Sequence, residues 1–239
     1  PRCRGPARLP PWGPYPSCPE GYDVWQPDSL EGSLERLKMD YVDSLIIHNP
    51  PFEILNGNKS HHFEELERLK EEGKIKGYGA SVDTYDEMKI LMETTDSQVI
   101  ETFFNILHQD TARAFDLAQR KNVRLIGKIP LDSGWLSGKY TAETTFSDIR
   151  ERWSREDIQT RATLVHRIKE ILNQEHELGQ MALAFCLSYD AITTVIPGNS
   201  SLSQLENNVK ASQISLSNAL RAQLEKFYKE EVKHLNLPW

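Results

Sequence analysis

Cysteine, long apolar runs and an excess of positive charge are scarce in this sequence, and each scarcity excludes a class of protein. Three cysteines among 239 residues (Cys3, Cys18 and Cys186) are too few for a disulfide framework, so free thiols are expected, with a Cys3–Cys18 bridge as the alternative. No apolar run approaches the roughly 20 residues that span a bilayer, and no secretory signal is expected. The net charge of −7 argues against a nucleic-acid partner, because phosphate neutralisation needs a basic face. These features predict a cytoplasmic protein without a membrane partner.

The common fingerprints of metal and nucleotide sites are missing as well. No cluster of cysteine and histidine has zinc-like spacing, so no metal site is predicted. Neither Gly-x-Gly-x-x-Gly after the first strand nor Gly-x4-Gly-Lys-Ser/Thr occurs, and these are the usual nucleotide-binding motifs of open sheets. What remains is an ordinary composition, 38% hydrophobic and 26% charged, in a chain long enough for a sizeable core.

Residues 1–27 differ from the rest of the chain. Seven of the first 19 residues are proline, and neither the period of a strand nor that of a helix is visible. A segment without an apolar face to bury is expected to be irregular or disordered. Regular structure is therefore predicted for residues 28–239 alone, as one domain.

From residue 28 onward, strand-like segments alternate with amphipathic helical segments. Short apolar runs predict five strands, over residues 41–48, 75–81, 99–107, 123–131 and 193–198. Helical spacing of apolar residues predicts helices around them, including residues 28–39, 108–122, 181–187 after an interruption at Gly179, and 218–233. Strands separated by helices imply a parallel sheet with crossover connections. Periodicity alone leaves both a barrel and a doubly wound sheet open.

Four segments resemble the motifs of one known family. Residues 33–48 (SLERLKMDYVDSLIIH) resemble SLxxLxxDYVDLxxIH, and residues 72–81 (EGKIKGYGAS) resemble EGKIRxIGVS. Residues 130–140 (PLDSGWLSGKY) resemble PLxxGxLxGKY, and residues 196–208 (IPGNSSLSQLENN) resemble IPGxxxxxQxxxN. Together, in this order and spacing, they are specific to the aldo-keto reductases, which the chain resembles over roughly residues 28–211.

This resemblance implies an α/β fold of the (β/α)8 TIM-barrel type, of which the chain supplies strands four to eight as a partial barrel. It also implies an oxidoreductase that uses NADP or NAD and interconverts small aldehydes or ketones with alcohols. Active sites of such barrels lie at the carboxyl ends of the strands, with phosphates near strands seven and eight. We therefore expect His48, Lys128 and Gly198 to lie around one rim.

The resemblance assigns roles to residues at the strand ends. His48 matches the family's catalytic histidine, which orients the substrate carbonyl and stabilises charge on its oxygen; a structural histidine is the alternative. Ser81 and Glu101 match ligands of the nicotinamide carboxamide, although many members have Gln at the second position. Lys128 stands where many members stack a Tyr on the nicotinamide ring, and a cation there would repel the oxidised ring.

Two further segments match phosphate-binding regions of the family. The first is a loop whose matching residues are Pro130, Leu131, Ser133, Leu136, Gly138 and Lys139. The second opens a helix and comprises Pro197, Gly198, Asn199, Ser200, Gln204 and Asn208. Free N–H groups, glycine and a helix N-terminus suit a pyrophosphate, while a plain turn and a capping box are the structural alternatives. The absence of Arg near Gly198 leaves the choice between NADP and NAD open.

The family's catalytic tetrad of Asp, Tyr, Lys and His is matched only at His48. In the family, Asp and Lys belong to strands two and three and Tyr lies between them. Nothing before residue 28 resembles those strands, so the chain is expected to be a truncated or aberrant member. Three hypotheses follow: turnover by a longer natural chain, NAD(P) binding without turnover, and a poorly folding fragment. In the third, five strands cannot close a barrel, and the open sheet edges favour self-association.

Overall fold

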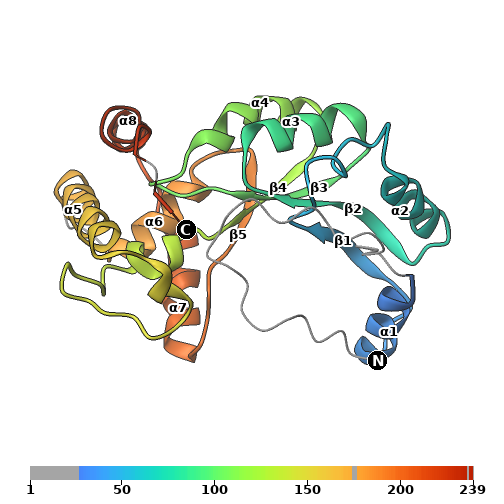
Figure 1. Cartoon of the computed structure of the whole chain (residues 1–239), viewed down its shortest axis with the longest axis horizontal. Helices are drawn as coiled ribbons and strands as arrows, with labels where there is room; N and C mark the ends of the chain where they lie inside the picture. The colour runs from blue at the N-terminus through green and yellow to red at the C-terminus, as the bar shows by residue number, and fades with distance from the viewer. Residues whose placement is uncertain (1–26, 174–176, 236, 239) are drawn as a thin grey trace.

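A curved, wholly parallel sheet forms the centre of the molecule (Figure 1). The computed structural model describes residues 27–173, 177–235 and 237–238. The sheet has the order β1-β2-β3-β4-β5, with each strand paired in parallel to the next. The strands are β1 (Val42–His48), β2 (Ile75–Val82), β3 (Val99–Phe103), β4 (Arg124–Lys128) and β5 (Ile192–Ile196). Their carboxyl ends therefore meet at one edge of the sheet.

The strand order distinguishes between the two architectures that periodicity left open. A doubly wound sheet reverses its strand order at a switch point, whereas the strands here follow the sequence without reversal. In Figure 1 the helices α2, α3 and α4 lie on the convex side of the sheet. This is the arrangement of part of a barrel wall. The helices are α1 (Pro27–Leu37), α2 (His61–Glu71), α3 (Tyr85–Thr94), α4 (Phe115–Arg120), α5 (Arg155–Leu172), α6 (Leu178–Leu187), α7 (Leu202–Lys210) and α8 (Asn218–Phe227).

The core lies between the convex face of the sheet and the helices that cover it. Along β2, Tyr78 is buried and its ring lies 6.0 Å from that of Phe63 on α2. Along β3, the Thr102 hydroxyl lies 3.2 Å from the Met88 sulfur on α3. Because side chains alternate along a strand, the neighbours of these residues point to the concave face. At Gly79 a Cβ would lie only 1.6 Å from the Val99 carbonyl oxygen, so the approach of β2 to β3 requires glycine.

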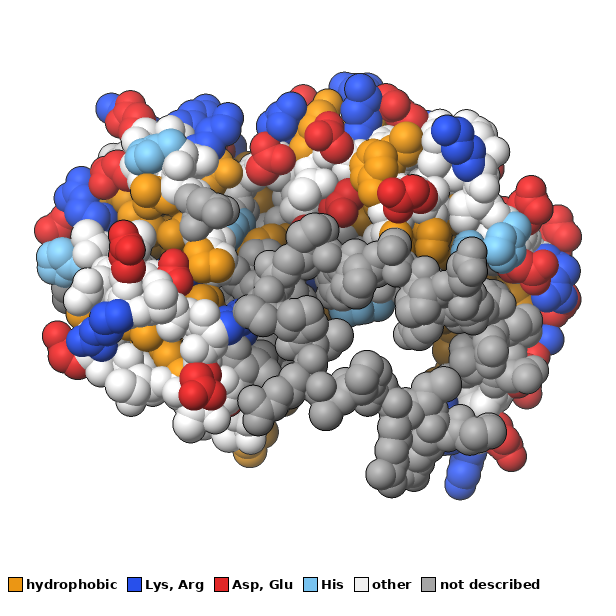
Figure 2. Space-filling model, viewed as in Figure 1, with side chains coloured by type: hydrophobic (Ala, Val, Ile, Leu, Met, Phe, Trp, Pro, Cys, Tyr) orange, Lys and Arg blue, Asp and Glu red, His pale blue; other side chains and the backbone are white. Residues whose placement is uncertain are grey.

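In the described part of the chain, β1 and β5 are edge strands with one neighbour each. Large hydrophobic side chains are exposed beside both edges. They are Leu37, Met39 and Tyr41 before β1, Ile196 at the end of β5, and Leu202, Leu205 and Val209 on α7. Helix α7 buries none of its residues. Figure 2 shows charged side chains around the rim of the molecule, with hydrophobic side chains visible between them on the left lobe. The prediction of an open sheet is thus confirmed for the described residues.

Several element boundaries differ from the sequence prediction. Strand β3 ends at Phe103 rather than at residue 107, because the Asn105 side chain accepts from the Leu107 N–H and folds the chain into a turn. Strand β4 ends at Lys128, since the next residue, Ile129, is left-handed (φ 53°). Strand β5 begins one residue earlier than predicted and ends at Ile196.

Three helix predictions also need correction. The helix expected over residues 108–122 is a 3-10 turn (Asp110–Ala114) followed by the short α4. The terminal helix ends as α8 at Phe227 and continues as a π-type turn (Tyr228–Val232). Gly179 does not interrupt a helix but lies in the first turn of α6, where its ideal Cβ would be 3.7 Å from the Ser137 Cα. That distance is an ordinary van der Waals contact, so the packing of α6 on the preceding loop does not require glycine.

One of the three cysteines lies among the described residues. Cys186 is a free, buried thiol in α6, and burial raises the pKa of this thiol, which disfavours its reactive thiolate form. Cys3 and Cys18, together with the irregular segment expected over residues 1–27 except Pro27, lie outside the described residues. Among the helices described, none is both long enough and apolar enough to cross a membrane.

Candidate functional site

The sheet register brings several of the predicted site residues to one level. His48 at the end of β1 pairs with Ser81 on β2, and Ser81 pairs with Glu101 on β3. Two residues further along β3, Phe103 pairs with Lys128, and Lys128 pairs with Ile196 on β5. Paired residues of parallel strands point to the same side of the sheet. All these positions therefore belong to the concave face, near its carboxyl edge.

Lys128 is the centre of this edge. It is only 6% exposed, and its ammonium donates to Asn49 Oδ1 at 2.7 Å and to Ser81 Oγ at 2.8 Å. Its Nζ also forms an ion pair with Asp83 Oδ1 at 2.6 Å. We call Asn49, Ser81, Asp83 and Lys128 the Lys128 cluster. A buried ammonium is stable only with such partners, and here they come from the ends of β1, β2 and β4.

Asp83 was not predicted as a site residue, although its position in the sequence indicates one. It follows directly after β2, so its carboxylate begins at the carboxyl edge of the sheet. Asn49, also missed, follows directly after β1, and its N–H donates to the Ser81 carbonyl at 3.1 Å. Polar residues that directly follow buried strands of a barrel are candidate site residues, because the carboxyl ends of the strands converge on the active site.

Asn105 is a third residue that the sequence did not reveal. It is completely buried after β3, and its Nδ2 donates to the Ile129 carbonyl at 2.9 Å. Its Oδ1 accepts from the Leu107 N–H at 2.8 Å. The side chain thus joins the ends of β3 and β4 and fixes the exit of the chain from β4.

The segment after β4, residues 129–138, has an unusual backbone; we call it the β4 loop. Ile129, Asp132 and Ser133 are left-handed at φ 53°, 45° and 53°, as are Gly134 and Gly138 at 101° and 79°. Side chains with a Cβ adopt this region at an energetic cost, so the surroundings must stabilise it. The predicted residues Pro130 and Leu136 are buried, Leu131 and Ser133 are partly exposed, and the exposed Lys139 lies with its Nζ 4.9 Å from the Tyr140 ring centroid.

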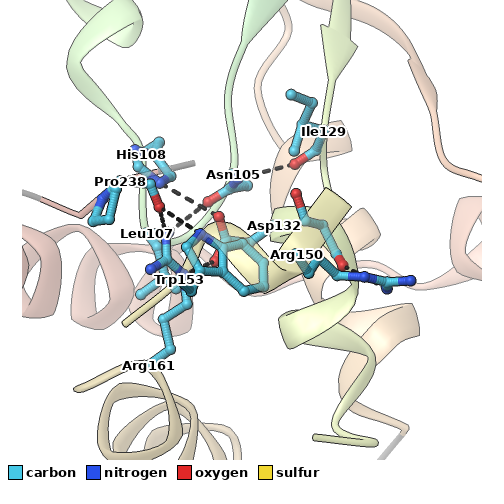
Figure 3. Close-up of polar contacts among 10 residues, drawn as sticks. Asn105, Leu107, His108, Ile129, Asp132, Arg150, Trp153, Arg161 and Pro238 are labelled. Atoms are coloured by element: carbon cyan, nitrogen blue, oxygen red, sulfur yellow. Dashed lines mark hydrogen bonds and ion pairs between the residues drawn. The ribbon is translucent and has the colours of Figure 1, made fainter. Parts of the chain in front are cut away.

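A buried ion pair anchors this loop (Figure 3). Asp132 and Arg161 are both completely buried, and Arg161 Nε donates to Asp132 Oδ2 at 3.1 Å. His108 Nε2 lies 3.4 Å from the other carboxylate oxygen. Burial by itself raises the pKa of Asp132, but the adjacent His108 and Arg161 outweigh it and hold that pKa below its ordinary value. Asp132 is therefore a carboxylate at neutral pH.

Arg150 approaches the same loop from outside. Its Nη1 lies 3.4 Å from the Ser133 carbonyl oxygen and also donates to the Tyr140 hydroxyl. The guanidinium is paired with Asp148 as well. This partly exposed arginine was not predicted, and it adds positive charge beside the predicted phosphate loop.

The second predicted phosphate region, at the start of α7, is built differently. Gln204 Oε1 accepts from the Ser200 N–H at 2.8 Å and from the Ser200 hydroxyl at 2.9 Å. Asn208 Nδ2 donates to Asn199 Oδ1 at 2.7 Å. Ser201 caps the helix, as the structural alternative supposed. These residues, which are exposed except for the partly buried Asn208, follow β5 together with Pro197 and Gly198 and thus lie at the same edge of the sheet as Lys128.

Comparison with known proteins agrees with this architecture. The family model described as the aldo/keto reductase family matches residues 12–229. L-galactose dehydrogenase of Arabidopsis thaliana is 26% identical over 188 residues, which cover 77% of this chain and 56% of the plant protein. Aldo-keto reductase yakc [NADP(+)] of Schizosaccharomyces pombe is 26% identical over 205 residues, which cover 80% of this chain and 58% of that protein.

A solved structure gives the same result for the fold. The holo form of aldo-keto reductase AKR11C1 from Bacillus halodurans matches with a TM-score of 0.70 and 25% identity, covering 88% of this chain and 66% of that one. The predicted partial barrel is thereby confirmed. The chain spans a little over half the length of the two curated relatives above. With most of its length matched by the family model and its sheet matching part of the barrel wall, this chain belongs to the aldo/keto reductase family.

Proposed function

We propose that this chain binds NADP or NAD at the carboxyl edge of its sheet and contributes to the interconversion of small aldehydes or ketones with alcohols. The observation that carries the proposal is the Lys128 cluster, a buried ammonium and its polar partners from three strand ends. Buried polar groups at the carboxyl ends of barrel strands are where such enzymes place their chemistry. Family membership gives the reaction type.

The residues present suit a dinucleotide. The Ser81 hydroxyl and Asn49 amide can bond a carboxamide, which needs both donors and acceptors. The β4 loop has a left-handed backbone, which can present main-chain N–H groups to an anion, although those of Asp132, Gly134 and Gly138 already donate to loop carbonyls. Arg150 beside the loop is paired with Asp148, and Lys139 after it is exposed. The start of α7, which the exposed Gly198 and Ser200 precede, offers a helix N-terminus. These features support the assignments of both phosphate-binding segments.

His48 is proposed to orient the substrate carbonyl. It ends β1 on the concave side, is exposed, and lies level with Ser81 in the sheet register. An imidazole N–H directed at the carbonyl oxygen would stabilise the negative charge that develops there during hydride transfer. The bound cofactor supplies the hydride. Because sequence matching carries over only this member of the tetrad, no proton donor is assigned to this chain.

Lys128 and Asp83 are proposed to set the charge around the nicotinamide. A lone ammonium would repel the oxidised, positively charged ring, but the Asp83 carboxylate at 2.6 Å largely offsets that charge. The Ser81 hydroxyl already accepts from Lys128, so it retains its own proton to donate to a carboxamide oxygen. Glu101, partly exposed on the neighbouring strand, can accept from the carboxamide N–H.

The test is a fluorescence titration of the whole chain with NADPH and with NADH, followed by assay of carbonyl-dependent NADPH oxidation. We expect saturable binding that weakens about tenfold or more in Lys128→Met, because Asn49, Ser81 and Asp83 then lose the ammonium that holds them together. The matched control is Lys121→Met, an exposed lysine after α4, which should bind as the unmodified chain does. Absence of saturable binding to either nucleotide would contradict the proposal.

The same titration addresses the choice of cofactor. The name of the yeast relative specifies NADP(+), whereas no arginine occurs near Gly198 in this sequence. A stronger affinity for NADPH than for NADH would indicate that Arg150 or Lys139 binds the extra phosphate. Equal affinities would indicate that the 2′-phosphate remains in solvent.

A further inference from the structure

The tail segment, residues 237–238, is held by two buried donors. The Pro238 carbonyl oxygen accepts from Trp153 Nε1 at 3.0 Å and from Arg161 Nη2. Trp153 is buried just before α5, and Arg161 lies within that helix. Figure 3 shows Trp153 and Arg161 both directed at Pro238. The tail thus docks by main-chain recognition.

Arg161 also contacts the β4 loop. Its Nε donates to Asp132 Oδ2 at 3.1 Å, while the Nη2 atom of the same guanidinium reaches Pro238. A guanidinium is planar and rigid, so its two contacts are geometrically coupled. Movement of the tail would change the position of the group that holds Asp132.

Asp132 occupies a position where the backbone needs support. Its own φ is 45°, and Ser133 after it is also left-handed. Residues with a Cβ persist in this conformation only where the surroundings stabilise it. The anchor of Asp132 is the buried guanidinium, assisted by His108 at 3.4 Å.

These contacts continue from Asp132 to the carboxyl edge of the sheet. The His108 ring lies 4.3 Å from the ring of Phe103, centroid to centroid. Phe103 ends β3 and pairs with Lys128 in the sheet register. A continuous set of contacts therefore leads from Pro238 through Arg161, Asp132 and His108 to the carboxyl edge.

We propose that Arg161 is a positioning residue, which couples docking of the tail segment to the conformation of the β4 loop. With the tail docked, the guanidinium is fixed and the loop holds its left-handed backbone; without it, the loop exchanges among other conformations. The consequence for cofactor affinity rests on the proposed function, whereas the coupling itself does not.

Hydrogen exchange of the cofactor-free chain tests the coupling directly. Within the loop, the N–H groups of Asp132, Gly134 and Gly138 donate to loop carbonyls and should be protected. In a chain that ends at Leu235, we expect these amides to exchange about tenfold faster or more, with the amides of β4 unchanged. Unchanged loop protection after removal of the tail would overturn the proposal.

Three substitutions separate the hydrogen bonds from other effects of the tail. Leu237→Ser removes a partly buried apolar side chain and keeps the Pro238 carbonyl, so loop protection should be retained. Trp153→Phe removes one donor to that carbonyl and should raise loop exchange by a smaller factor than truncation. Arg161→Lys keeps the charge but cannot reach both partners in one plane, so it should resemble truncation.

Cofactor titration of the truncated chain provides the functional readout. We expect NADPH affinity to fall about fivefold to tenfold, because part of the binding energy would then order the loop. Faster loop exchange with unchanged affinity would contradict the functional consequence. If the unmodified chain binds no nucleotide, the proposed function fails, while the exchange data still decide whether tail and loop are coupled.

Discussion

The two regions proposed to hold a cofactor are constructed in opposite ways. The Lys128 cluster and the β4 loop are each held by buried charged groups, Lys128 in the first and Asp132 with Arg161 in the second, which are paired across elements distant in sequence. The segment that opens α7 is largely exposed, and its polar side chains bond within the segment itself, as Gln204 does to Ser200 and Asn208 to Asn199. Burial obliges polar groups to find partners, whereas exposed groups can use water.

This difference predicts which parts of the molecule are rigid. Removal of a partner in the buried region leaves a desolvated charge, so its effects on stability should be large and extend through the fold. Removal of a contact at α7 should act locally, because this helix buries no residue. The following predictions test that contrast, beginning with the largest expected effect.

Arg161→Met should produce the largest loss of stability. It leaves the completely buried Asp132 carboxylate without its guanidinium, which typically costs about 3–5 kcal/mol. Chemical denaturation measures the change in the free energy of unfolding, compared between proteins whose unfolding depends equally steeply on denaturant concentration. The control is Arg167→Met on the same helix, an exposed arginine paired with Glu231 and Glu170, for which about 1 kcal/mol or less is expected. Similar losses for both would contradict the assigned anchor.

The same ion pair should leave a signature in acid. Because the folded state lowers the pKa of Asp132, the contribution of this carboxylate to stability is complete above its ordinary pKa of 3.8 and is lost as the pH falls through the depressed pKa of the folded state. In Asp132→Asn, whose side chain does not titrate there, this part of the acid destabilisation should disappear. Equal pH dependence of stability in both proteins below pH 3.8 would contradict the account.

Lys128→Met should have the next largest effect on stability. It leaves the completely buried Ser81 hydroxyl and the side-chain oxygen of Asn49 without their donor, at a cost of about 2–4 kcal/mol for the two acceptors together. The lost ion pair with Asp83 adds less, because that carboxylate is 28% exposed. Thermal unfolding measures the change, and a loss no larger than that of Lys121→Met would show that the cluster does not stabilise the fold.

Ser201→Ala should have a small and local effect. Ser201 accepts from the Gln204 N–H as the N-cap of α7, and removal of such a cap costs about 1 kcal/mol of helix stability. Since α7 packs little of itself into the core, hydrogen exchange should rise in α7 while the global unfolding transition is unchanged. A shift of the global transition as large as that of Lys128→Met would show that α7 is integral to the core.

Leu202→Ser with Val209→Ser should change association rather than folding. These side chains are 71% and 56% exposed beside the open edge of β5, so folding stability should change by less than about 0.5 kcal/mol. If copies of the chain associate through these open edges, sedimentation should show a larger monomer fraction in the variant. An identical association constant would exclude this surface from self-association.

The sequence predicted the order and type of most elements, because apolar periodicity and the four motifs depend on local pattern. Strands β1 and β2, whose bounds differ from the prediction by one residue at most at either end, illustrate this success. Asp83, Asn105 and Arg161 were missed, because their roles depend on partners distant in sequence. The break before α4 was missed for a related reason, since the Thr111 hydroxyl there donates to the Phe103 carbonyl at 2.9 Å.

The most direct test of the central claim is to map nucleotide binding on the whole chain. The backbone amide signals of an isotopically labelled sample would be recorded during titration with NADPH. We expect the largest shifts at Ser81, at Lys128 with the β4 loop, and at residues 198–201, with none in α2 on the convex side. Shifts confined to other regions, or absent at saturating NADPH, would contradict a dinucleotide site at the carboxyl edge of this sheet.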